Sequence, residues 1–295
     1  MDLLSTVIQF RARQNAEQLC FSGRQVQAWF LREVERHRPV LATLIHDGFR
    51  PNPEDKHGFR PYTCSSLYKG PHVAWKLAEG DWCWLRLTSL TAELSDLLVK
   101  TVLPDLIPVA KIGQVELDVV PWQPQQPQNP WVAEDTYASL VRQAALSTET
   151  RLEMEFSSIT SFKKKMRQNG FEVDVPLPVP EMVFGNYLNH WSAFSGEQLP
   201  EILWEFVEEY LVVNELEIHS ERAQLQFDHK QRAATGFVGR VRFAILGGKG
   251  KSRFGANWEH LAALVRMLAA YSFYCGTGQD TTVGLGQTRV KLQGR

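Results

Sequence analysis

Four glycines near the end of the chain could do chemistry on a phosphate group. Gly276, Gly278, Gly284 and Gly286 follow a G-x-G-x5-G-x-G pattern between a helical pattern and a final strand pattern. Glycine permits positive φ and the close approach of another backbone, so such a loop could direct several N–H groups at phosphate oxygens. A dinucleotide-binding fold is disfavoured, because its glycines lie after a strand and before a helix.

His46 is the second residue that could do chemistry. It ends a short helical pattern, Pro39–His46, and a loop follows it. Loops held by rigid elements often carry catalytic groups, and an imidazole with a pKa of about 6.5 could transfer a proton at neutral pH. The plainer interpretation, a surface histidine that caps helix carbonyls, stays open.

The loop after His46 carries charges of both signs. Its cations are Arg50, Lys56, His57 and Arg60. One or two of them could stabilise negative charge that develops on a phosphate, although a proline-broken loop of mixed charge is also typical of plain solvated surface. The acidic residues Asp47, Glu54 and Asp55 lack the paired spacing of a metal site, so we expect neither a metal nor another cofactor.

Basic residues in the second half are further candidates for phosphate contact. They are Lys163, Lys164, Lys165 and Arg167 in one run, and Arg240 and Arg242 on a strand pattern. The run suits a phosphate backbone, but it is equally typical of a solvated face. Arg240 and Arg242 alternate with apolar residues, which places both on one face of a sheet. The basic loop 247–253 lacks P-loop spacing, so we do not expect ATP binding.

The elements that must position these residues occur in the same order in both halves. In the first half, strand patterns lie at 3–13, 62–68, 82–90 and 115–119, and helical patterns at 26–34, 39–46 and 91–103. In the second half, strand patterns lie at 152–162, 225–227, 241–245 and 290–292, and helical patterns at 181–193, 201–213 and 261–268. Each half has the β-α-β-β-α-β order of a ferredoxin-like unit. We therefore predict an α+β protein of two tandem ferredoxin-like, RRM-like domains with antiparallel sheets.

A segment rich in proline and glutamine, residues 123–133, separates the two halves. This composition is typical of a linker. We therefore predict an N-terminal domain at 1–122, which carries the candidate histidine, and a C-terminal domain at 134–295, which carries the glycine loop. At the start of the first long helix, Ser22 and Gln25 have the spacing of a capping box.

Composition limits the classes of protein that the chain could form. Hydrophobic residues make up 44% of the 295 residues, which supports real folded cores. The net charge of −1 does not itself indicate a nucleic-acid partner, so RNA binding would need local basic surfaces. No apolar run reaches the roughly 18 residues of a membrane span, and the first residues lack the basic flank of a signal peptide. We therefore expect a cytoplasmic protein with no membrane partner. The four scattered cysteines are typical of reduced core thiols.

Three segments together resemble the CRISPR repeat-processing endoribonucleases of the RAMP superfamily. They are the glycine loop 276–286, the strand pattern 236–243, and the stretch 44–65, which is similar to the early "LH…FTxS" region of that family. The resemblance implies metal-independent cleavage of precursor CRISPR RNA within each repeat. The ribose 2′-OH would attack the adjacent phosphate and leave a 2′,3′-cyclic phosphate and a 5′-OH. The implied partner is repeat RNA, with a CRISPR effector complex as a further candidate.

The resemblance also implies roles for particular residues. His46 matches the catalytic histidine of the family and would act as general base or general acid. Arg60 falls where several members carry a lysine that stabilises the transition state, and Lys56 is a second candidate for that role. Some members have a catalytic tyrosine on the first helix, where this sequence has Trp-Phe-Leu at 29–31. We therefore expect a histidine with one cation rather than a full triad.

Alternatives remain for the histidine and for the function. The place of the catalytic histidine varies within the family, so His37 or His57 could take the role of His46. A second hypothesis for the function is a non-catalytic RNA-binding subunit of a CRISPR effector complex, because related RAMP proteins share the fold and the glycine loop without cutting RNA. A third is an unrelated metabolic enzyme with a phosphate-binding glycine loop.

Overall fold

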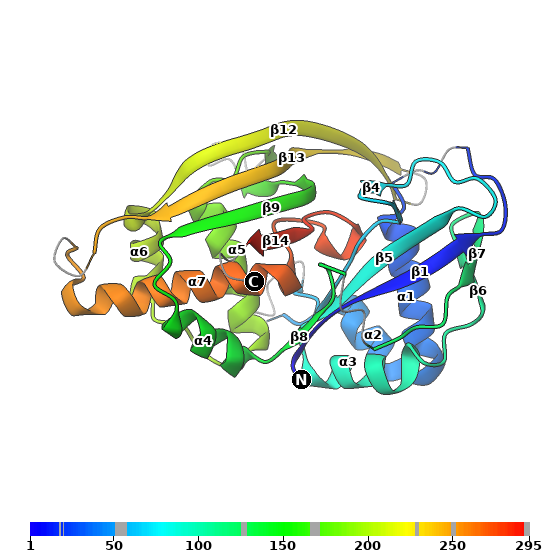
Figure 1. The fold of residues 1–295 in the computed structure, drawn as a ribbon, viewed down its shortest axis with the longest axis horizontal. Coiled ribbons are helices and arrows are strands. Elements are labelled where there is room, and N and C mark those ends of the chain that lie inside the picture. Colours follow the sequence, from blue (N-terminus) through cyan, green and yellow to red (C-terminus); the bar gives the residue numbers. More distant parts are fainter. Residues whose placement is uncertain are drawn as a thin grey trace. The chain divides into compact units, whose positions relative to one another are not determined.

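The computed structural model describes residues 1–17, 19, 21–50, 58–124, 129–165, 172–227, 230–248 and 252–291. Helices and antiparallel strands together form its two compact units, and the segments of these units interleave along the chain (Figure 1). Unit 1 contains residues 1–135, 223–233 and 280–285, and unit 2 contains residues 136–222, 234–279 and 286–295. The predicted α+β class with antiparallel sheets is confirmed.

Unit 1 is built on an antiparallel sheet with the path β4-β3-β5-β1-β7-β6, to which β2 adds by pairing with β5 and β8 by pairing with β1. Its strands are β1 (Leu3–Ala12), β2 (Tyr62–Cys64), β3 (Tyr68–Lys69), β4 (His72–Val73), β5 (Trp82–Ser89), β6 (Val109–Ile112), β7 (Val115–Val119) and β8 (Ala133–Asp135). Its helices are α1 (Gly23–His37), α2 (Pro39–Asp47) and α3 (Ala92–Leu97), the last followed by a π-helical turn, Leu98–Val102.

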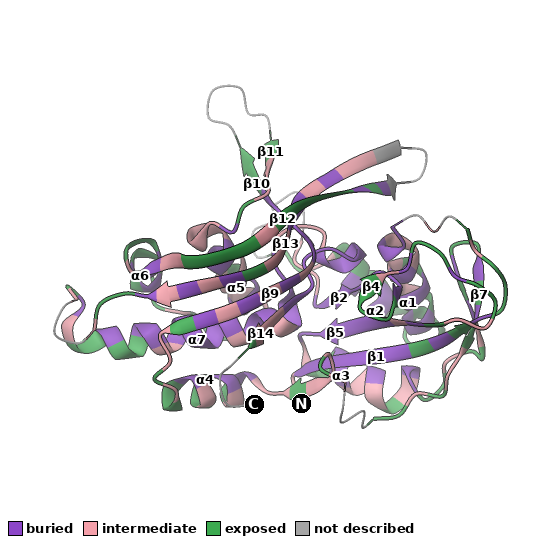
Figure 2. Cartoon of the chain, turned by 45° about the horizontal axis from the view of Figure 1, so that its top comes forward, coloured by how far each residue is buried: buried purple, intermediate pink, exposed green. Residues whose placement is uncertain are grey.

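Helix α1 covers one face of this sheet. β1 is buried over most of its length (Figure 2), and Phe10 on β1 meets Trp29 on α1 edge to face, with ring centroids 5.8 Å apart. Successive side chains of a strand point to opposite faces. The exposed residues Gln9 and Arg11 therefore lie on the face away from α1.

The predicted capping box at the start of α1 is wrong. Ser22 is the residue before the helix, but its hydroxyl accepts a hydrogen bond from the Leu67 N–H, at 2.8 Å, and makes no capping bond. Among the described residues, the side-chain oxygen of Gln25 is buried without a hydrogen bond. The hydrogen bond from Leu67, 45 residues away, therefore takes the place of the predicted bond between the Ser22 hydroxyl and the backbone of its own helix.

Unit 2 contains a four-stranded antiparallel sheet of order β12-β13-β9-β14 and a separate hairpin of β10 and β11. Its strands are β9 (Arg151–Thr160), β10 (Phe162–Lys165), β11 (Glu172–Val175), β12 (Leu211–Phe227), β13 (Lys230–Ile245) and β14 (Thr288–Lys291). Its helices are α4 (Tyr137–Leu146), α5 (Pro180–Phe194), α6 (Ile202–Tyr210) and α7 (Trp258–Cys275), with a 3-10 turn at Gly255–Asn257. A second 3-10 turn, Thr281–Val283, and the 223–233 end of the β12–β13 hairpin are assigned to unit 1.

Aromatic side chains fill the core of unit 2. Tyr137, Trp191 and Tyr271 form a cluster with centroids 5.0 to 5.7 Å apart, and Phe184 on α5 contacts Phe243 on β13. These contacts bind α4, α5 and α7 to one face of the sheet. No helix within the described part of the chain is both long and apolar enough to cross a membrane.

Candidate active site

Arg60 joins helix α2 to the glycine-rich loop within unit 1. Its Nε donates a hydrogen bond to the backbone carbonyl of His46 at 2.8 Å, and its Nη1 donates to Oγ1 of Thr282 at 3.3 Å. His46 lies in the last turn of α2, Arg60 precedes β2, and Thr282 lies in the 3-10 turn 281–283. The structure therefore brings the two sequence-predicted residues His46 and Arg60 together, with a third residue that the sequence reasoning missed.

The backbone holds both ends of the loop between His46 and Arg60. Gly48 ends α2 with a φ of +78°, a value that glycine adopts without strain. Phe49 and Phe59 then exchange two backbone hydrogen bonds of 2.7 Å each. Because this bridge closes the base of the loop, Arg60 is held next to the end of α2. Lys56 and His57 lie outside the described residues.

His46 presents its imidazole to solvent. The side chain is 60% exposed, and Nδ1 lies 3.2 Å from Oδ1 of Asp47. When the neutral ring donates from Nδ1 to this carboxylate, Nε2 is left as a proton acceptor. Nε2 has no hydrogen-bond partner within the described ranges. An accessible nitrogen of this kind is what a general base requires.

The alternative histidine, His37, has a different setting. It lies in the last turn of α1, its side chain is only 16% exposed, and its Nε2 is 3.5 Å from Oδ2 of Asp105. A largely buried ring beside a carboxylate is less open to a substrate than His46.

All four glycines of the loop adopt positive φ. The values are +68° at Gly276, +79° at Gly278, +99° at Gly284 and +64° at Gly286. Two of them also allow close approach: a Cβ on Gly278 would lie 2.3 Å from the Ser161 carbonyl oxygen, and one on Gly284 would lie 2.6 Å from the Ser66 hydroxyl. The spacing of the glycines is thus explained by the conformation of the loop.

The N–H groups of three of these glycines have acceptors inside the protein. Gly276 donates to Ser272, Gly278 to the side chain of Asn186, and Gly286 to Ile159. Gly284 forms an isolated parallel bridge with Ser65. The prediction that the loop grips phosphate with its own amides stays a prediction, and in this conformation three of the four glycine amides are already engaged.

Gly23 is a further residue of the site that the sequence reasoning missed. A Cβ at this first residue of α1 would lie 1.8 Å from the carbonyl oxygen of Val283. Only glycine therefore lets the 3-10 turn, and with it Thr282, lie against the start of the helix. The sequence signal is weak, because a single glycine at the start of a helix has many explanations.

The predicted basic run lies partly on the β10–β11 hairpin. Lys163 pairs with Asp174 at 2.7 Å, whereas Lys164 and Lys165 are exposed. Arg167 lies outside the described residues. Two of the four cations thus face solvent without a carboxylate partner among the described residues.

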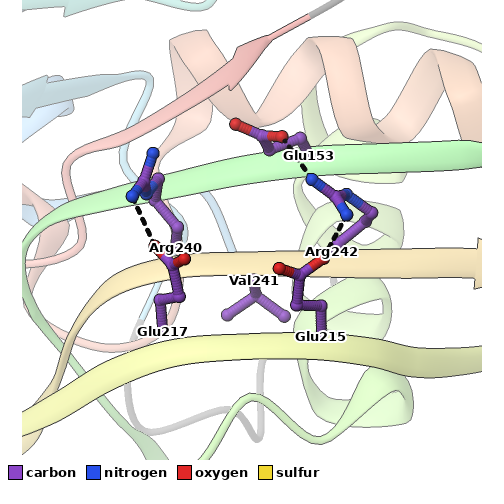
Figure 3. A pocket seen from close by; sticks show the side chains of 6 residues that line it. All are labelled: Glu153, Glu215, Glu217, Arg240, Val241 and Arg242. Carbon is purple, nitrogen blue, oxygen red and sulfur yellow. Dashed lines mark hydrogen bonds and ion pairs between the residues drawn. The ribbon is translucent and has the colours of Figure 1, made fainter.

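Arg240 and Arg242 lie on one face of β13, as the sequence predicts, but both are held by glutamates. Arg240 pairs with Glu217, and Arg242 pairs with Glu215 and, at 3.0 Å, with Glu153 (Figure 3). These residues line a shallow pocket on the sheet of unit 2. The Arg242 guanidinium, followed by the Lys291 ammonium, holds the pKa of Glu153 below its usual value.

The ion pairs continue across the whole sheet of unit 2. On β9, Glu153 lies opposite Arg242 of β13 and forms an ion pair with Lys291 of β14. Glu155, two residues further on, lies opposite Arg240 and forms an ion pair with Arg289. Acidic and basic side chains therefore alternate over four strands, and their charges cancel.

Two units, each with helices packed on an antiparallel sheet, define a tandem ferredoxin-like α+β protein. One solved structure with the same fold is a Cas6 product complex, which is 20% identical with a TM-score of 0.75; the match covers 99% of this chain and 100% of that chain. Another is a Cas6 substrate-mimic complex, which is 21% identical with a TM-score of 0.63; the match covers 99% of this chain and 100% of that chain. The structure of Thermus thermophilus Cas6 is also similar: it is 18% identical with a TM-score of 0.66, and the match covers 98% of each chain. Among curated proteins, none matches the sequence.

The family model of the CRISPR-associated endoribonuclease Cas6 matches residues 154–288. This region contains most of β9, all of β13 and the glycine-rich loop. The resemblance to the CRISPR repeat-processing endoribonucleases is confirmed by this match together with the shared fold.

Proposed function

We propose that this protein is an endoribonuclease that cleaves precursor CRISPR RNA within its repeats and needs no metal ion. The 2′-OH of a ribose attacks the adjacent phosphorus, and the bond from phosphorus to the 5′ oxygen breaks. The products are a 2′,3′-cyclic phosphate and a 5′-OH. The observation that carries the proposal is the contact of Arg60 with the His46 carbonyl and with Thr282, which holds a guanidinium at the backbone of the residue that bears the imidazole.

His46 moves the proton in this reaction. Its exposed Nε2 either accepts the proton of the attacking 2′-OH or, once protonated, donates a proton to the leaving 5′ oxygen. Positioned proton transfer of this kind contributes roughly 10²–10⁴-fold to a rate. The Asp47 carboxylate beside Nδ1 orients the ring for either role.

Arg60 stabilises the negative charge that grows on the phosphate oxygens. Its contacts to His46 and Thr282 use Nε and Nη1, which leaves the remaining N–H donors of the guanidinium for the substrate. The two contacts also fix the cation in place before RNA arrives, and a pre-positioned charge stabilises a transition state more than a mobile one does. Lys56 is the second candidate for this role.

In this proposal the glycine loop positions a side chain of the active site and does not itself bind RNA. Because Gly276, Gly278 and Gly286 donate their N–H groups inside the protein, RNA contact through these amides would require the loop to rearrange. In the described conformation the loop instead delivers Thr282 to Arg60. The RNA backbone is then held mainly by side-chain cations.

Those cations are the remaining predicted RNA-binding residues. They are Lys163, Lys164, Lys165 and Arg167 near the β10–β11 hairpin and Arg240 and Arg242 on β13. The exposed Lys164 and Lys165 can contact phosphate directly. Arg240 and Arg242 must first exchange glutamate for phosphate, so we expect them to contribute less.

The test compares two exposed histidines. His46→Ala should abolish cleavage of repeat RNA in EDTA and leave RNA affinity unchanged. His219→Ala is the matched control, because this ring is also exposed and also lies beside a carboxylate, that of Glu221 at 2.9 Å; this variant should cut at the wild-type rate. Cleavage by His46→Ala at the wild-type rate would refute the assignment. Tight binding without any defined cut by the wild-type protein would favour the non-catalytic RAMP subunit instead.

A further inference from the structure

The sheet of unit 1 carries an aromatic surface on the side away from α1, and its outermost ring, that of Trp82, is exposed. Cys83 and Leu85 of β5 are buried with Phe10 and Ile8 of β1, their register partners on the helix-covered side. The alternate residues therefore point the other way. These are Gln9 and Arg11 of β1, Trp82 and Trp84 of β5, and Tyr68 of β3, which is in register with Trp84. We call this set the aromatic face.

Two rings of the aromatic face, those of Tyr68 and Trp84, are fixed in place. Tyr68 and Trp84 stack with centroids 4.6 Å apart and planes 20° from parallel, and the Trp84 indole N–H donates to the Gly70 carbonyl at 2.9 Å. Trp82, two residues before Trp84 on the same strand, is 60% exposed. More than half of the Trp82 side chain is therefore open to solvent and accessible to a ligand.

Only part of this side of the sheet is open. Towards the start of β1, strand β8 pairs with Leu3–Ser5, and the Arg86 guanidinium lies 4.8 Å from the ring of Trp131. The Arg86 side chain also donates to the Ser5 hydroxyl at 2.8 Å. The Trp131 ring therefore covers this side of the sheet at Arg86, while Arg11 and Trp82 stay exposed.

The charge beside the exposed rings is positive and available. Arg11, in register with Trp82, donates to the Gly80 carbonyl at 3.4 Å and has no ion pair among the described residues. The nearest carboxylate in register with Arg11, Asp118, is bound by Arg13 at 3.4 Å. A flat exposed ring next to a guanidinium suits a nucleobase joined to a phosphate.

We propose that the aromatic face stacks unpaired bases of bound RNA, with Trp82 as the main stacking surface and Arg11 as its phosphate contact. This inference rests on the proposed function only in taking RNA as the ligand. His46 lies on α2, which packs against α1 on the other side of the same sheet. The bases held at Trp82 are therefore at a different part of the RNA from the phosphate that is cut.

The RNA that binds the aromatic face is single-stranded, because bases in a duplex do not offer their faces to a protein ring. Stacking on an aromatic side chain accepts any base. We therefore expect this surface to add affinity and to add little sequence preference. Gln9, beside Trp84 in register, is the residue that could read a base edge.

The experiment measures binding of a short labelled oligoadenylate and of a ribose-phosphate chain of equal length without bases. Trp82→Ala should weaken oligoadenylate binding roughly tenfold, whereas Trp82→Phe keeps a ring and should lose much less. Neither change should alter binding of the chain without bases. Leu146→Ala, at a position 80% exposed on α4, is the control and should bind as the wild type does.

The binding measurement separates this inference from the proposed function. Oligoadenylate binding involves no cleavage, so the affinity loss of Trp82→Ala does not depend on whether His46 is catalytic. Equal oligoadenylate affinity of Trp82→Ala and wild type would overturn the stacking surface and leave the role of His46 untouched. If the wild-type protein does not cut RNA but the affinity loss is found, the stacking surface stands without the endonuclease.

Discussion

Arg60 and Thr282 are hydrogen-bonded across 222 positions of the sequence, with Nη1 and Oγ1 3.3 Å apart. The same guanidinium donates to the carbonyl of His46. The glycine-rich loop and the candidate histidine, which are separate signals in the sequence, thus meet through one side chain. In this arrangement the loop supports the proposed active site by holding Arg60.

Removing the Thr282 hydroxyl should therefore slow cleavage. Thr282→Val keeps the volume of the side chain but removes the acceptor for Arg60, so the cation is free to move. We expect the single-turnover rate at saturating protein to fall roughly tenfold, with RNA affinity little changed. Thr282→Ser restores the acceptor and should restore the rate. A Thr282→Val protein that cuts as fast as wild type would show that the hydroxyl does not position Arg60.

Gly278 should tolerate alanine less well than Gly196. Both have positive φ, +79° and +75°, but an added Cβ meets the Ser161 backbone oxygen at Gly278 and nothing within 4 Å at Gly196. Gly196→Ala isolates the backbone strain of about 1 kcal/mol. Gly278→Ala adds a steric cost of about 1–3 kcal/mol. Urea unfolding of both variants gives the comparison, and equal losses of unfolding free energy would contradict the role given to Gly278.

The salt dependence of RNA binding should become weaker when Lys164 and Lys165 are replaced. Replacing both by glutamine should weaken binding and reduce the slope of log K against log salt by roughly 0.7–0.9 for each phosphate that the protein no longer neutralises. Lys100→Gln is the control, since that exposed side chain pairs with Asp96 on unit 1. An unchanged slope in the double variant would remove these lysines from the RNA interface.

The stability of the protein should fall in mild acid because of His190. Burial lowers the pKa of this ring, and its hydrogen bond to the Asn186 carbonyl raises the pKa by less. The unfolded chain has a histidine pKa of about 6.5. As pH falls below that value the unfolded state binds the proton first, so folding free energy is lost between about 6.5 and the lower folded pKa.

His190→Gln tests this pH dependence directly. The variant lacks the titrating ring, so it should lose less unfolding free energy than the wild type between about pH 7 and about pH 5. Urea unfolding at both pH values measures the difference. If both proteins lose the same amount, the acid sensitivity comes from other groups.

Much of the fold was predictable because its patterns are local. The strand predicted at 82–90 and the helical segment ending at His46 are confirmed by the structure. The predicted helix 201–213 is too long, because the chain leaves α6 after Tyr210 and Leu211 begins β12. Pairing with β13 decides that boundary, and such pairing is not visible in a short window of sequence.

The candidate site was predictable only in part for the same reason. His46 and Arg60 were found through a segment that resembles a family. Thr282 and Gly23 were missed, because their roles depend on contacts across most of the chain. The glutamates that hold Arg240 and Arg242 depend on strand register, which alternating residues in a single strand do not specify.

The central claim is that the RNA supplies its own nucleophile. Once the cut in a repeat transcript has been mapped, the same RNA is prepared with a single 2′-deoxy nucleotide on the 5′ side of the scissile phosphate. In EDTA the all-ribose RNA should be cut to a 2′,3′-cyclic phosphate and a 5′-OH, and the substituted RNA should bind equally well and remain whole. Cleavage of the 2′-deoxy RNA at that position would contradict the account.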